Sequence, residues 1–277
     1  MKSRLVSITG ATGFVGWHTA EAFRRGGWQV RAVVRRGNRR PLPDGVEAIE
    51  ASLDDAASLA AAFRGSDAVV HAAALIRAKN EAAFRRVNVD GTAASVRAAA
   101  EAGARFVLVS SQAAGGQGTP ERPRREDDPP APVNAYGRSK LASEAIVRAS
   151  TGPWTILRPC AVYGPRDRGF LPLFSLVRRG IAVVPSRADT AFTLIFIDDL
   201  VRAILLAAEE AGAVGQTMFV GHAQPGTGSD VVRAIAAHEA RRVRPVRVPD
   251  ALFGALAWLG DRLWSLDITP MIDTGRL

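Results

Sequence analysis

The sequence predicts an α/β protein of the Rossmann type, with a doubly wound parallel sheet and a small, interleaved C-terminal substrate lobe. Two observations predict this class: apolar segments alternate with helical patterns between Leu5 and Arg158, and a glycine-rich turn follows the first segment. At 277 residues the chain can form one large domain with a smaller lobe. The expected strands are Leu5–Thr9, Gln29–Val34, Val46–Glu50, Ala68–Ala72, Phe106–Ser110 and Thr155–Arg158.

The helical patterns between these strands are rich in alanine, the strongest helix former. Gly65 and Gly103 follow two of them, and glycine at this position commonly ends a helix. After Gly164 the alternation weakens, so residues 1–163 are expected to form mainly the Rossmann domain and residues 164–277 mainly the smaller lobe. The expected helices are Phe14 to about Arg25, Asp54–Phe63, Glu81–Ala102, one that opens at Tyr136, Phe170–Arg179 and Asp198–Ala211, with a strand at Phe192–Ile197.

Three glycines with the spacing G-x-x-G-x-x-G form the turn after the first strand, a pattern typical of dinucleotide binding. Gly10 permits a tight turn, Gly13 lets the backbone approach a pyrophosphate, and Gly16 lets the next helix pack closely against the sheet. That helix directs free N–H groups and its positive dipole end toward the phosphates. A plain connecting turn is the alternative, and the position after the first strand argues against it.

Arg35 and Arg36 end the second strand about twenty residues past the glycines, where an acidic residue normally binds the ribose of NAD. A guanidinium group can instead bind a 2′-phosphate through paired hydrogen bonds. NADP is therefore the expected cofactor, with NAD as the second choice. The alternative interpretation is a solvated basic loop in an arginine-rich protein.

The net charge of +9 would ordinarily suggest a nucleic-acid partner. However, the positive residues are nearly all arginines scattered along the chain, so no nucleic acid is expected. Cys160 is the only cysteine, which excludes an internal disulfide, and its apolar neighbours predict a buried thiol that is not a nucleophile.

No metal is expected, because the four histidines lie far apart in the sequence. The chain shows no apolar signal segment and no apolar run of the ~20 residues that a membrane span requires. The sequence therefore predicts a soluble, cytoplasmic protein without integral membrane association.

Tyr136 and Lys140 are four residues apart and share one face of the helix that opens there. A phenol titrates near ~10, and a neighbouring ammonium favours the phenolate, so Tyr136 is a candidate general acid/base. The alternative is an exposed tyrosine beside a solvated lysine. The preceding loop, Gly115–Asn134, is rich in proline and charge and is expected at the carboxyl edge of the sheet, where α/β proteins bind ligands.

Together these motifs resemble the extended short-chain dehydrogenases/reductases, also called the NAD(P)-dependent epimerase/dehydratase family. The resemblance runs from Arg4 to about Ala208. It rests on Thr9–Gly16, His71–Ala74, Asn88–Thr92, Ser110–Ser111, Tyr136-x-x-x-Lys140 and Arg158–Pro165.

The resemblance implies that Tyr136 is the catalytic acid/base and that Lys140 lowers its pKa and holds the nicotinamide ribose. It also implies that Asn88 steadies the active-site backbone, that His71–Ala74 run beside the adenosine and that Pro159–Val162 line the nicotinamide. The implied cofactor-binding residues are Gly10, Thr12, Gly13, Phe14, Val15, Gly16, Arg35, Arg36, Ser52, Leu53, His71, Ala72, Ala73, Ala74, Asn88, Ser110, Tyr136, Lys140, Pro159 and Val162.

Three positions depart from the family pattern. Gln112 stands where a Ser or Thr usually orients the substrate, so either Gln112 or Ser111 takes the third catalytic role. Ser52 replaces an acid that often binds adenine, and Phe196 replaces a histidine near the substrate lobe. These changes favour a substrate with few hydroxyl groups.

The first functional hypothesis is an oxidoreductase that moves hydride between NADP(H) and a carbonyl or secondary alcohol on an apolar small molecule. The second is a nucleotide-sugar epimerase or dehydratase that retains its cofactor. A dehydratase would be expected to carry an acidic residue at or just after Gln112, where none stands. The third is a regulator that senses NADP without turnover.

Large apolar residues recur at helical spacing in Ala251–Leu266. This pattern predicts a helix with one buried face. A substrate wall, a homodimer contact and a lipid-facing surface are the alternatives for its aromatic residues.

Overall fold

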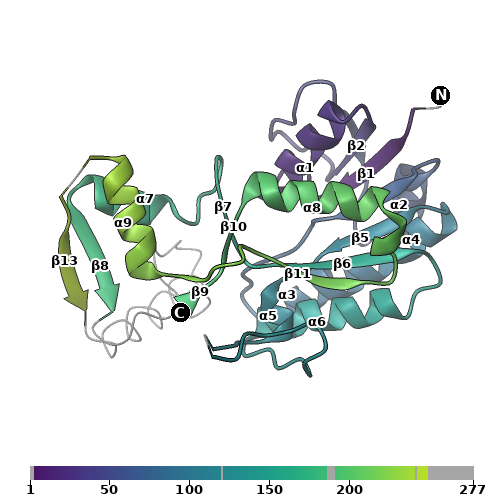
Figure 1. Ribbon diagram of the computed structural model, residues 1–277. Helices are drawn as coiled ribbons and strands as arrows, with labels where there is room; N and C mark the ends of the chain where they lie inside the picture. Colours follow the sequence, from purple (N-terminus) through teal and green to yellow (C-terminus); the bar gives the residue numbers. More distant parts are fainter. Residues whose placement is uncertain (1–2, 120, 186–190, 241, 249–277) are drawn as a thin grey trace. The chain divides into compact units, whose positions relative to one another are not determined.

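The computed structural model describes residues 3–119, 121–185, 191–240 and 242–248 (Figure 1). By its internal contacts the chain divides into two compact units. The first comprises residues 1–118, 122–162 and 195–221, and the second comprises residues 119–121, 163–194 and 222–277.

The first unit is built on a seven-stranded sheet in the order β11-β6-β5-β4-β1-β2-β3, and every strand pairing in it is parallel. The chain moves outward from β1 to β3 and then continues on the other side from β4, so the strand order reverses between β1 and β4. Ligands of such sheets bind at the carboxyl edge beside this reversal. The strands are β1 (Leu5–Thr9), β2 (Gln29–Val34), β3 (Glu47–Glu50), β4 (Ala68–His71), β5 (Arg105–Val109), β6 (Trp154–Pro159) and β11 (Thr217–Val220).

Helices cover both faces of this sheet, which confirms the predicted doubly wound class (Figure 1). One face packs against α1 (Phe14–Arg25) and α8 (Ile197–Glu209), with Phe23 and Ile204 fully buried between the layers. The other face packs against α2 (Ala56–Phe63), α4 (Gly91–Glu101) and α6 (Ala135–Arg148). Six strands were expected with ends within two residues of those observed, whereas β11 was missed.

The helix expected over Glu81–Ala102 is interrupted in the structure. It begins as α3 (Glu81–Phe84), passes through a π-helical segment, η1 (Arg85–Asp90), and continues as α4. Such π-helical insertions are frequent at functional sites. Gly65 and Gly103 follow α2 and α4 with φ of +73° and +67°, as expected for glycines that end helices.

The second unit contains α7 (Leu171–Arg178) and α9 (Gly228–His238) beside a parallel pair of strands, β8 (Ile181–Pro185) and β13 (Arg244–Val248). Val177 of α7 and Ile235 of α9 are buried in its small core. The strand expected at Phe192–Ile197 is divided into two shorter strands. The remaining elements are α5 (Gln112–Gly115), β7 (Ala161–Tyr163), β9 (Ala191–Phe192), β10 (Leu194–Phe196), η2 (Ala211–Ala213) and β12 (Gly226–Thr227).

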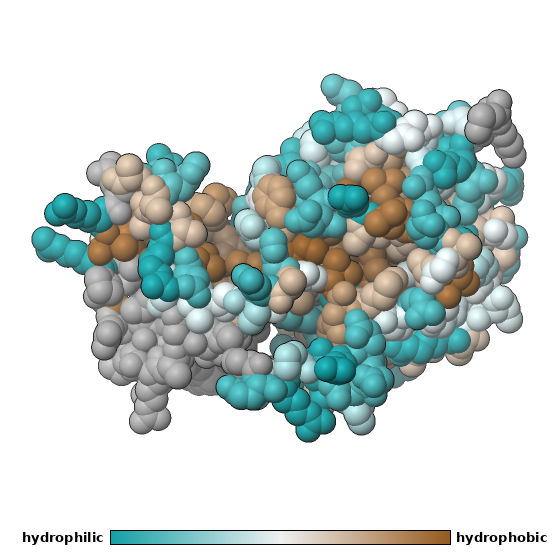
Figure 2. Space-filling view, in the orientation of Figure 1, coloured by the Kyte–Doolittle hydropathy of each residue, from teal (hydrophilic) through white to brown (hydrophobic). Residues whose placement is uncertain are grey.

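Hydrophobic residues lie between hydrophilic ones on the visible face of the first unit (Figure 2). Within the described ranges, every helix is too short or too polar to cross a lipid bilayer. The helix expected at Ala251–Leu266 lies outside the described residues.

Candidate active site

The glycine turn joins β1 to α1 and is too tight for side chains at two of its three glycines. Gly10 has φ of +74°, and a Cβ there would lie 2.6 Å from the backbone nitrogen of Ala73. A Cβ on Gly16 would lie 2.2 Å from the carbonyl oxygen of Gly10. The close contact expected of Gly16 is therefore made with the turn itself and not with the sheet.

The N-terminus of α1 is free to bind an anion. Its N-cap residue is Gly13, which has no side chain to bond the first N–H groups, and its first turn contains no acidic residue. Thr12, Phe14 and Val15 are half-buried around it. The N–H groups without a side-chain cap and the helix dipole together fit a pyrophosphate.

The end of β2 presents Arg35 and Arg36, both exposed. Within the part of the chain that the structure describes, neither forms an ion pair. The Glu50 carboxylate reaches the same turn from β3, where its Oε1 accepts a hydrogen bond of 3.4 Å from the Gly37 N–H. Sequence reasoning missed Glu50 because the residue lies far from Gly37 in the chain, and its proximity comes from the parallel pairing of Val34 with Glu50.

His71 ends β4 with its imidazole fully buried and stacked on Phe106. Its Nδ1 lies 2.8 Å from the Thr9 Oγ1, and its Nε2 has no hydrogen-bond partner among the described residues. Burial, with a smaller effect of the Lys140 charge, lowers the pKa of His71 to about 3, so the ring is neutral. The ring lies in the core, whereas the following residues, Ala72–Ala74, are half-buried.

Two residues that were expected near the adenine lie in the loop after β3. Ser52 Oγ accepts a hydrogen bond of 3.3 Å from the Asp54 N–H. Leu53 packs on the start of α4, where a Cβ on Gly91 would lie 3.0 Å from its Cδ1. Both residues shape the loop, and their contact with a cofactor stays a prediction.

Asn88 lies within η1 and is 1% exposed. Its Oδ1 accepts a hydrogen bond of 2.8 Å from the Leu75 N–H, and its Nδ2 donates to the Leu75 carbonyl at 2.9 Å. The same Nδ2 donates to Ser139 Oγ on α6 at 2.9 Å. Asn88 thus ties the chain segment after β4 to the helix that carries Tyr136.

Local packing brings Tyr136 to Ser111. The Oδ1 of Asn134 caps α6 by accepting the Gly137 N–H at 2.7 Å. A Cβ on Gly137 would lie 2.4 Å from the Ala113 carbonyl oxygen, so only glycine allows α6 to approach α5 this closely. At this approach the Tyr136 hydroxyl is hydrogen-bonded to the Ser111 side chain.

The electrostatics of Tyr136 differ from the expectation. Burial raises its pKa above the ordinary value, and the hydrogen bond with Ser111 is the interaction that opposes this rise. The sequence predicted that Lys140 lowers the pKa of Tyr136, and Lys140 is not among the groups that shift this pKa in the structure. The buried Lys140 ammonium instead donates a hydrogen bond of 2.9 Å from Nζ to the carbonyl of Val109, the last residue of β5.

Lys140 is 1% exposed. Burial lowers its pKa to about 8, and the charge of Glu144 opposes this effect. Because α6 places Glu144 one turn after Lys140, the two charges share the buried face of the helix.

Glu144 forms a buried ionic network that sequence reasoning missed. It receives two hydrogen bonds from Arg158, Nε to Oε1 at 2.9 Å and a terminal nitrogen to Oε2 at 2.7 Å. Ser110 Oγ donates to the same carboxylate at 2.6 Å, so the Ser110 hydroxyl is bound within the protein, and its contact with a cofactor stays a prediction. Burial raises the pKa of Glu144, but the bonds from Arg158 and Ser110 hold it below the ordinary value. A charged residue at a buried helix position was the signal that could have revealed this network.

Gln112 is half-buried, and its side-chain amide makes no hydrogen bond to another described residue. It follows Ser111, so its amide is available to a ligand at the same edge of the sheet. Pro159 ends β6 at this edge, and Val162 follows it in β7. Burial raises the pKa of the Cys160 thiol between them to about 11, which agrees with a non-nucleophilic thiol. No group of three or more metal-binding side chains occurs among the described residues.

Several of the residues that the sequence selected lie along one edge of the sheet. β1, β4, β5 and β6 are adjacent and parallel, and the glycine turn, Ala72, Ser111 and Pro159 stand at or just after their carboxyl ends. The uncapped helix, the free arginines and the hydroxyl pair fit a dinucleotide with a reacting group beside Tyr136.

Comparison with known proteins agrees with this geometry. The model of the NAD dependent epimerase/dehydratase family matches residues 6–221. The chain is 35% identical over 272 residues to a ceramide reductase of Caulobacter vibrioides. The similarity covers 97% of this chain and 81% of the relative. It is 28% identical to the 4-hydroxy-2-methyl-3-oxo-4-farnesyl-3,4-dihydroquinoline-1-oxide ketoreductase of Stigmatella aurantiaca, with 93% of this chain and 80% of the relative covered.

Among solved structures, that of MoeE5 in complex with UDP-glucose and NAD is similar, with a TM-score of 0.73 and 28% identity. The similarity covers 88% of this chain and 85% of MoeE5. The chain is therefore an NAD(P)-dependent enzyme that belongs to the NAD dependent epimerase/dehydratase family.

Proposed function

We propose that this enzyme transfers hydride between NADP(H) and a ketone or secondary alcohol on an apolar, lipid-type molecule. The hydrogen-bonded hydroxyls of Ser111 and Tyr136, at the carboxyl edge of the sheet, carry the proposal. The ceramide reductase and the farnesyl-bearing ketoreductase, both similar over most of this chain, support the lipid-type substrate.

Tyr136 is the proton donor of this reaction in the direction of reduction. Because burial raises its pKa, the phenol keeps its proton at neutral pH and is ready to protonate a carbonyl oxygen that receives hydride at carbon. Ser111 is the third catalytic residue of this proposal, since its side chain bonds to the Tyr136 hydroxyl that protonates the carbonyl oxygen. The nicotinamide supplies or accepts the hydride when bound.

Gln112 orients the substrate in this proposal. Its amide has no protein partner among the described residues and follows Ser111 directly. An amide can donate to a carbonyl without adding a charge to the site, which suits a substrate that is mostly apolar. Lys140 holds the nicotinamide ribose, as the resemblance to the family implies.

NADP is the proposed cofactor because Arg35 and Arg36 are exposed and unpaired within the described chain, beside the expected ribose position. Two guanidinium groups can enclose a 2′-phosphate with several charge-assisted hydrogen bonds. The Glu50 carboxylate, which bonds the Gly37 N–H, opposes this preference because it would repel the phosphate.

Replacing Arg35 with aspartate is expected to weaken NADPH binding by about tenfold to a hundredfold and to shift the preference toward NADH, since an acid can bind the ribose hydroxyls. Titration of nicotinamide fluorescence would measure both dissociation constants. Glu50→Gln should strengthen NADPH binding, and Arg64→Asp, an exposed arginine after α2, should change neither constant. Equal affinities for NADPH and NADH in the wild-type protein would contradict the NADP assignment.

A substrate screen tests the proposed function. Long-chain ketones and secondary alcohols, ketones of sphingolipid type among them, would be compared with nucleotide sugars while the absorbance of reduced nicotinamide is followed. We expect stoichiometric consumption of NADPH with an apolar ketone.

The second candidate function is the interconversion of nucleotide sugars with a retained cofactor. The similarity to MoeE5, solved with UDP-glucose and NAD, favours it. Conversion of a nucleotide sugar into its epimer with no net change in nicotinamide absorbance would establish this function and reject the reductase.

A further inference from the structure

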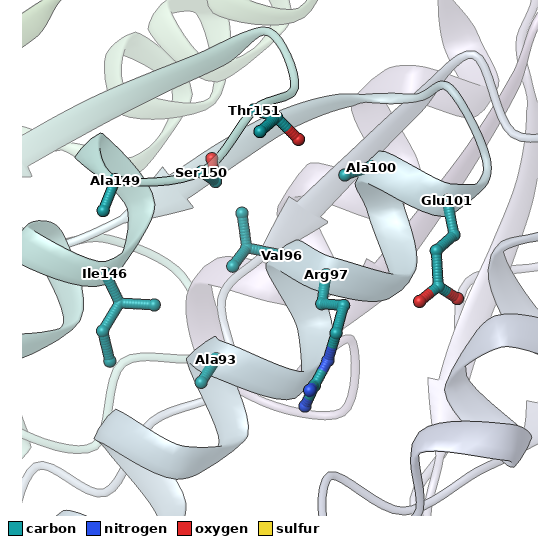
Figure 3. Close-up of a pocket in the computed structure, with 9 residues that line it drawn as sticks. All are labelled: Ala93, Val96, Arg97, Ala100, Glu101, Ile146, Ala149, Ser150 and Thr151. Carbon is teal, nitrogen blue, oxygen red and sulfur yellow. The ribbon is translucent and has the colours of Figure 1, made fainter.

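The two hydroxyl groups of the proposed site stand on helices of very different length. Tyr136 lies on α6, which has 14 residues and packs along α4, with Val147 buried in the core that also contains Val96. Ile146 of α6 and Val96 of α4 line a groove between the outer faces of these two helices (Figure 3). Tyr136 is therefore carried by a helix with an extensive packing surface.

Ser111 stands instead at the N-terminus of α5, which has only four residues. The Ala114 N–H donates a hydrogen bond of 3.0 Å to the Ser111 carbonyl and closes this single turn. A helix of one turn is not stable by itself in water. The position of Ser111 beside Tyr136 therefore depends on the contacts that hold α5 from outside.

The carbonyl group of Gly115, at the other end of α5, is bound by Arg124 of the following loop. The Gly115 oxygen accepts hydrogen bonds from the Arg124 Nε at 3.0 Å and from a terminal nitrogen, Nη2, at 2.8 Å. The Ala131 N–H donates to the same oxygen at 3.0 Å. The Arg124 Nη2 also donates to the Pro129 carbonyl at 2.6 Å. One guanidinium group thus joins the end of α5 to the part of the loop that leads to α6.

The Arg124 side chain is itself held in place. It is 21% exposed, and its remaining terminal nitrogen lies 3.9 Å from the carboxylate of Asp128, which is 17% exposed. That carboxylate also accepts the Arg125 N–H at 2.9 Å, so its position is set by the loop backbone. A guanidinium group is planar and presents its donors in a fixed fork. The bonds from Arg124 to Gly115 therefore have a defined direction and are largely shielded from water.

The end of α5 also packs against β11. A Cβ on Gly115 would lie 2.6 Å from the Phe219 Cζ, so the α5 backbone touches this ring. The Phe219 N–H donates to the Glu126 Oε1 at 2.9 Å, which ties β11 to the same loop. On the side of α6, a Cβ on Gly137 would lie 2.4 Å from the Ala113 carbonyl oxygen. Because α5 is held between β11, the loop and α6, a shift at one end of so short a helix moves the other end.

We propose that Arg124 is a positioning residue that fixes the Ser111 hydroxyl against Tyr136. It binds α5 at the Gly115 carbonyl and acts through the turn between Gly115 and Ser111, a rise of about 6 Å. A displacement of about 1 Å at a reacting group can lower the rate by about a hundredfold. The expected effect on turnover rests on the proposed function of Ser111 and Tyr136, whereas the link from Arg124 to α5 does not.

Arg124→Ala tests the proposal, and Arg125→Ala, at the exposed arginine next in the chain, is the matched control. We expect Arg124→Ala to lower the turnover number on a ketone from the screen by about tenfold to a hundredfold. The dissociation constant of NADPH should change by less than about twofold, because Gly115 and Pro129 are not among the residues predicted to hold the cofactor. Arg125→Ala removes the same charge and should change neither quantity. A turnover number that Arg124→Ala leaves unchanged would contradict the proposal.

A double-mutant cycle shows whether Arg124 acts through Ser111. In chains that already carry Ser111→Ala the hydroxyl to be positioned is absent, so Arg124→Ala should lower the remaining turnover by less than about threefold. An arginine that only stabilised the fold would lower turnover equally in both backgrounds. Equal losses in the two backgrounds would therefore overturn the proposal.

Hydrogen–deuterium exchange provides a measurement that requires no substrate. The amides of Ala114 and Gly116 donate to carbonyls of Ser111 and Gln112, and in Arg124→Ala they should exchange at least about tenfold faster. The amides of α6 should keep their wild-type rates, and Arg125→Ala should alter none of them. Unchanged exchange at α5 would reject the link from Arg124 to this helix. Faster exchange at α5 in an enzyme that reduces no ketone would refute the proposed function and support the link.

Discussion

Replacement of Tyr136 with phenylalanine is expected to lower the turnover number by about 10²- to 10⁴-fold, the usual contribution of a general acid or base. The variant loses only the hydroxyl that is hydrogen-bonded to Ser111, while the ring remains beside Phe84. NADPH should therefore still bind. Steady-state rates on a substrate from the screen and fluorescence titration of NADPH would measure the two effects separately.

Tyr163→Phe is the matched control, because Tyr163 is the only other tyrosine of the chain and belongs to the second unit. It loses the same oxygen at a position with no proposed part in proton transfer, so most of the activity should remain. If Tyr136→Phe retained near wild-type turnover, Tyr136 would not be the proton donor.

Glu144→Gln is expected to lower the free energy of unfolding by about 3 kcal/mol, because it leaves the Arg158 guanidinium buried without a counter-charge. The Glu144 side chain is 0% exposed and that of Arg158 is 4% exposed, so water cannot replace the lost charge. For a unit of this size the change corresponds to a melting temperature lower by about 6 to 12 °C. Thermal unfolding followed by circular dichroism would measure it.

The stabilisation by Glu144 should depend on pH. Its pKa in the folded chain lies below the ordinary 4.5, so the folded state favours the charged form. The difference between wild type and variant is therefore fully present above pH 4.5 and shrinks as the pH falls through the folded pKa.

The control for this variant is Glu47→Gln, which removes an exposed pair with Arg31. That change should alter the free energy of unfolding by less than about 1 kcal/mol. An equally small effect of Glu144→Gln would show that the buried network does not stabilise the fold.

The sequence by itself determined the features that depend on local pattern. Alternating apolar and helical segments predicted six of the seven strands of the sheet, and the glycine spacing predicted the turn between β1 and α1. Tyr136 and Lys140 were found in the same way, because four-residue spacing and residue type are both local properties. Local rules of this kind act within one helix or one turn, so they can be read without knowing the fold.

Only the tertiary structure decided which distant residues meet. β11 was missed because its four half-buried residues become a strand by pairing with β6, about sixty residues earlier in the chain. Glu50 reaches the β2 turn through strand register, and Ser111 reaches Tyr136 because Gly137 lets two helices touch.

The buried ionic network shows most clearly that contacts between distant residues depend on the tertiary structure. Arg158 neutralises Glu144 across two elements of secondary structure, α6 and β6. A charged side chain in the core is stable only when its partner arrives with good geometry. The packing of α6 on the sheet brings Arg158 to Glu144. The spacing of residues in the sequence does not predict such a long-range contact.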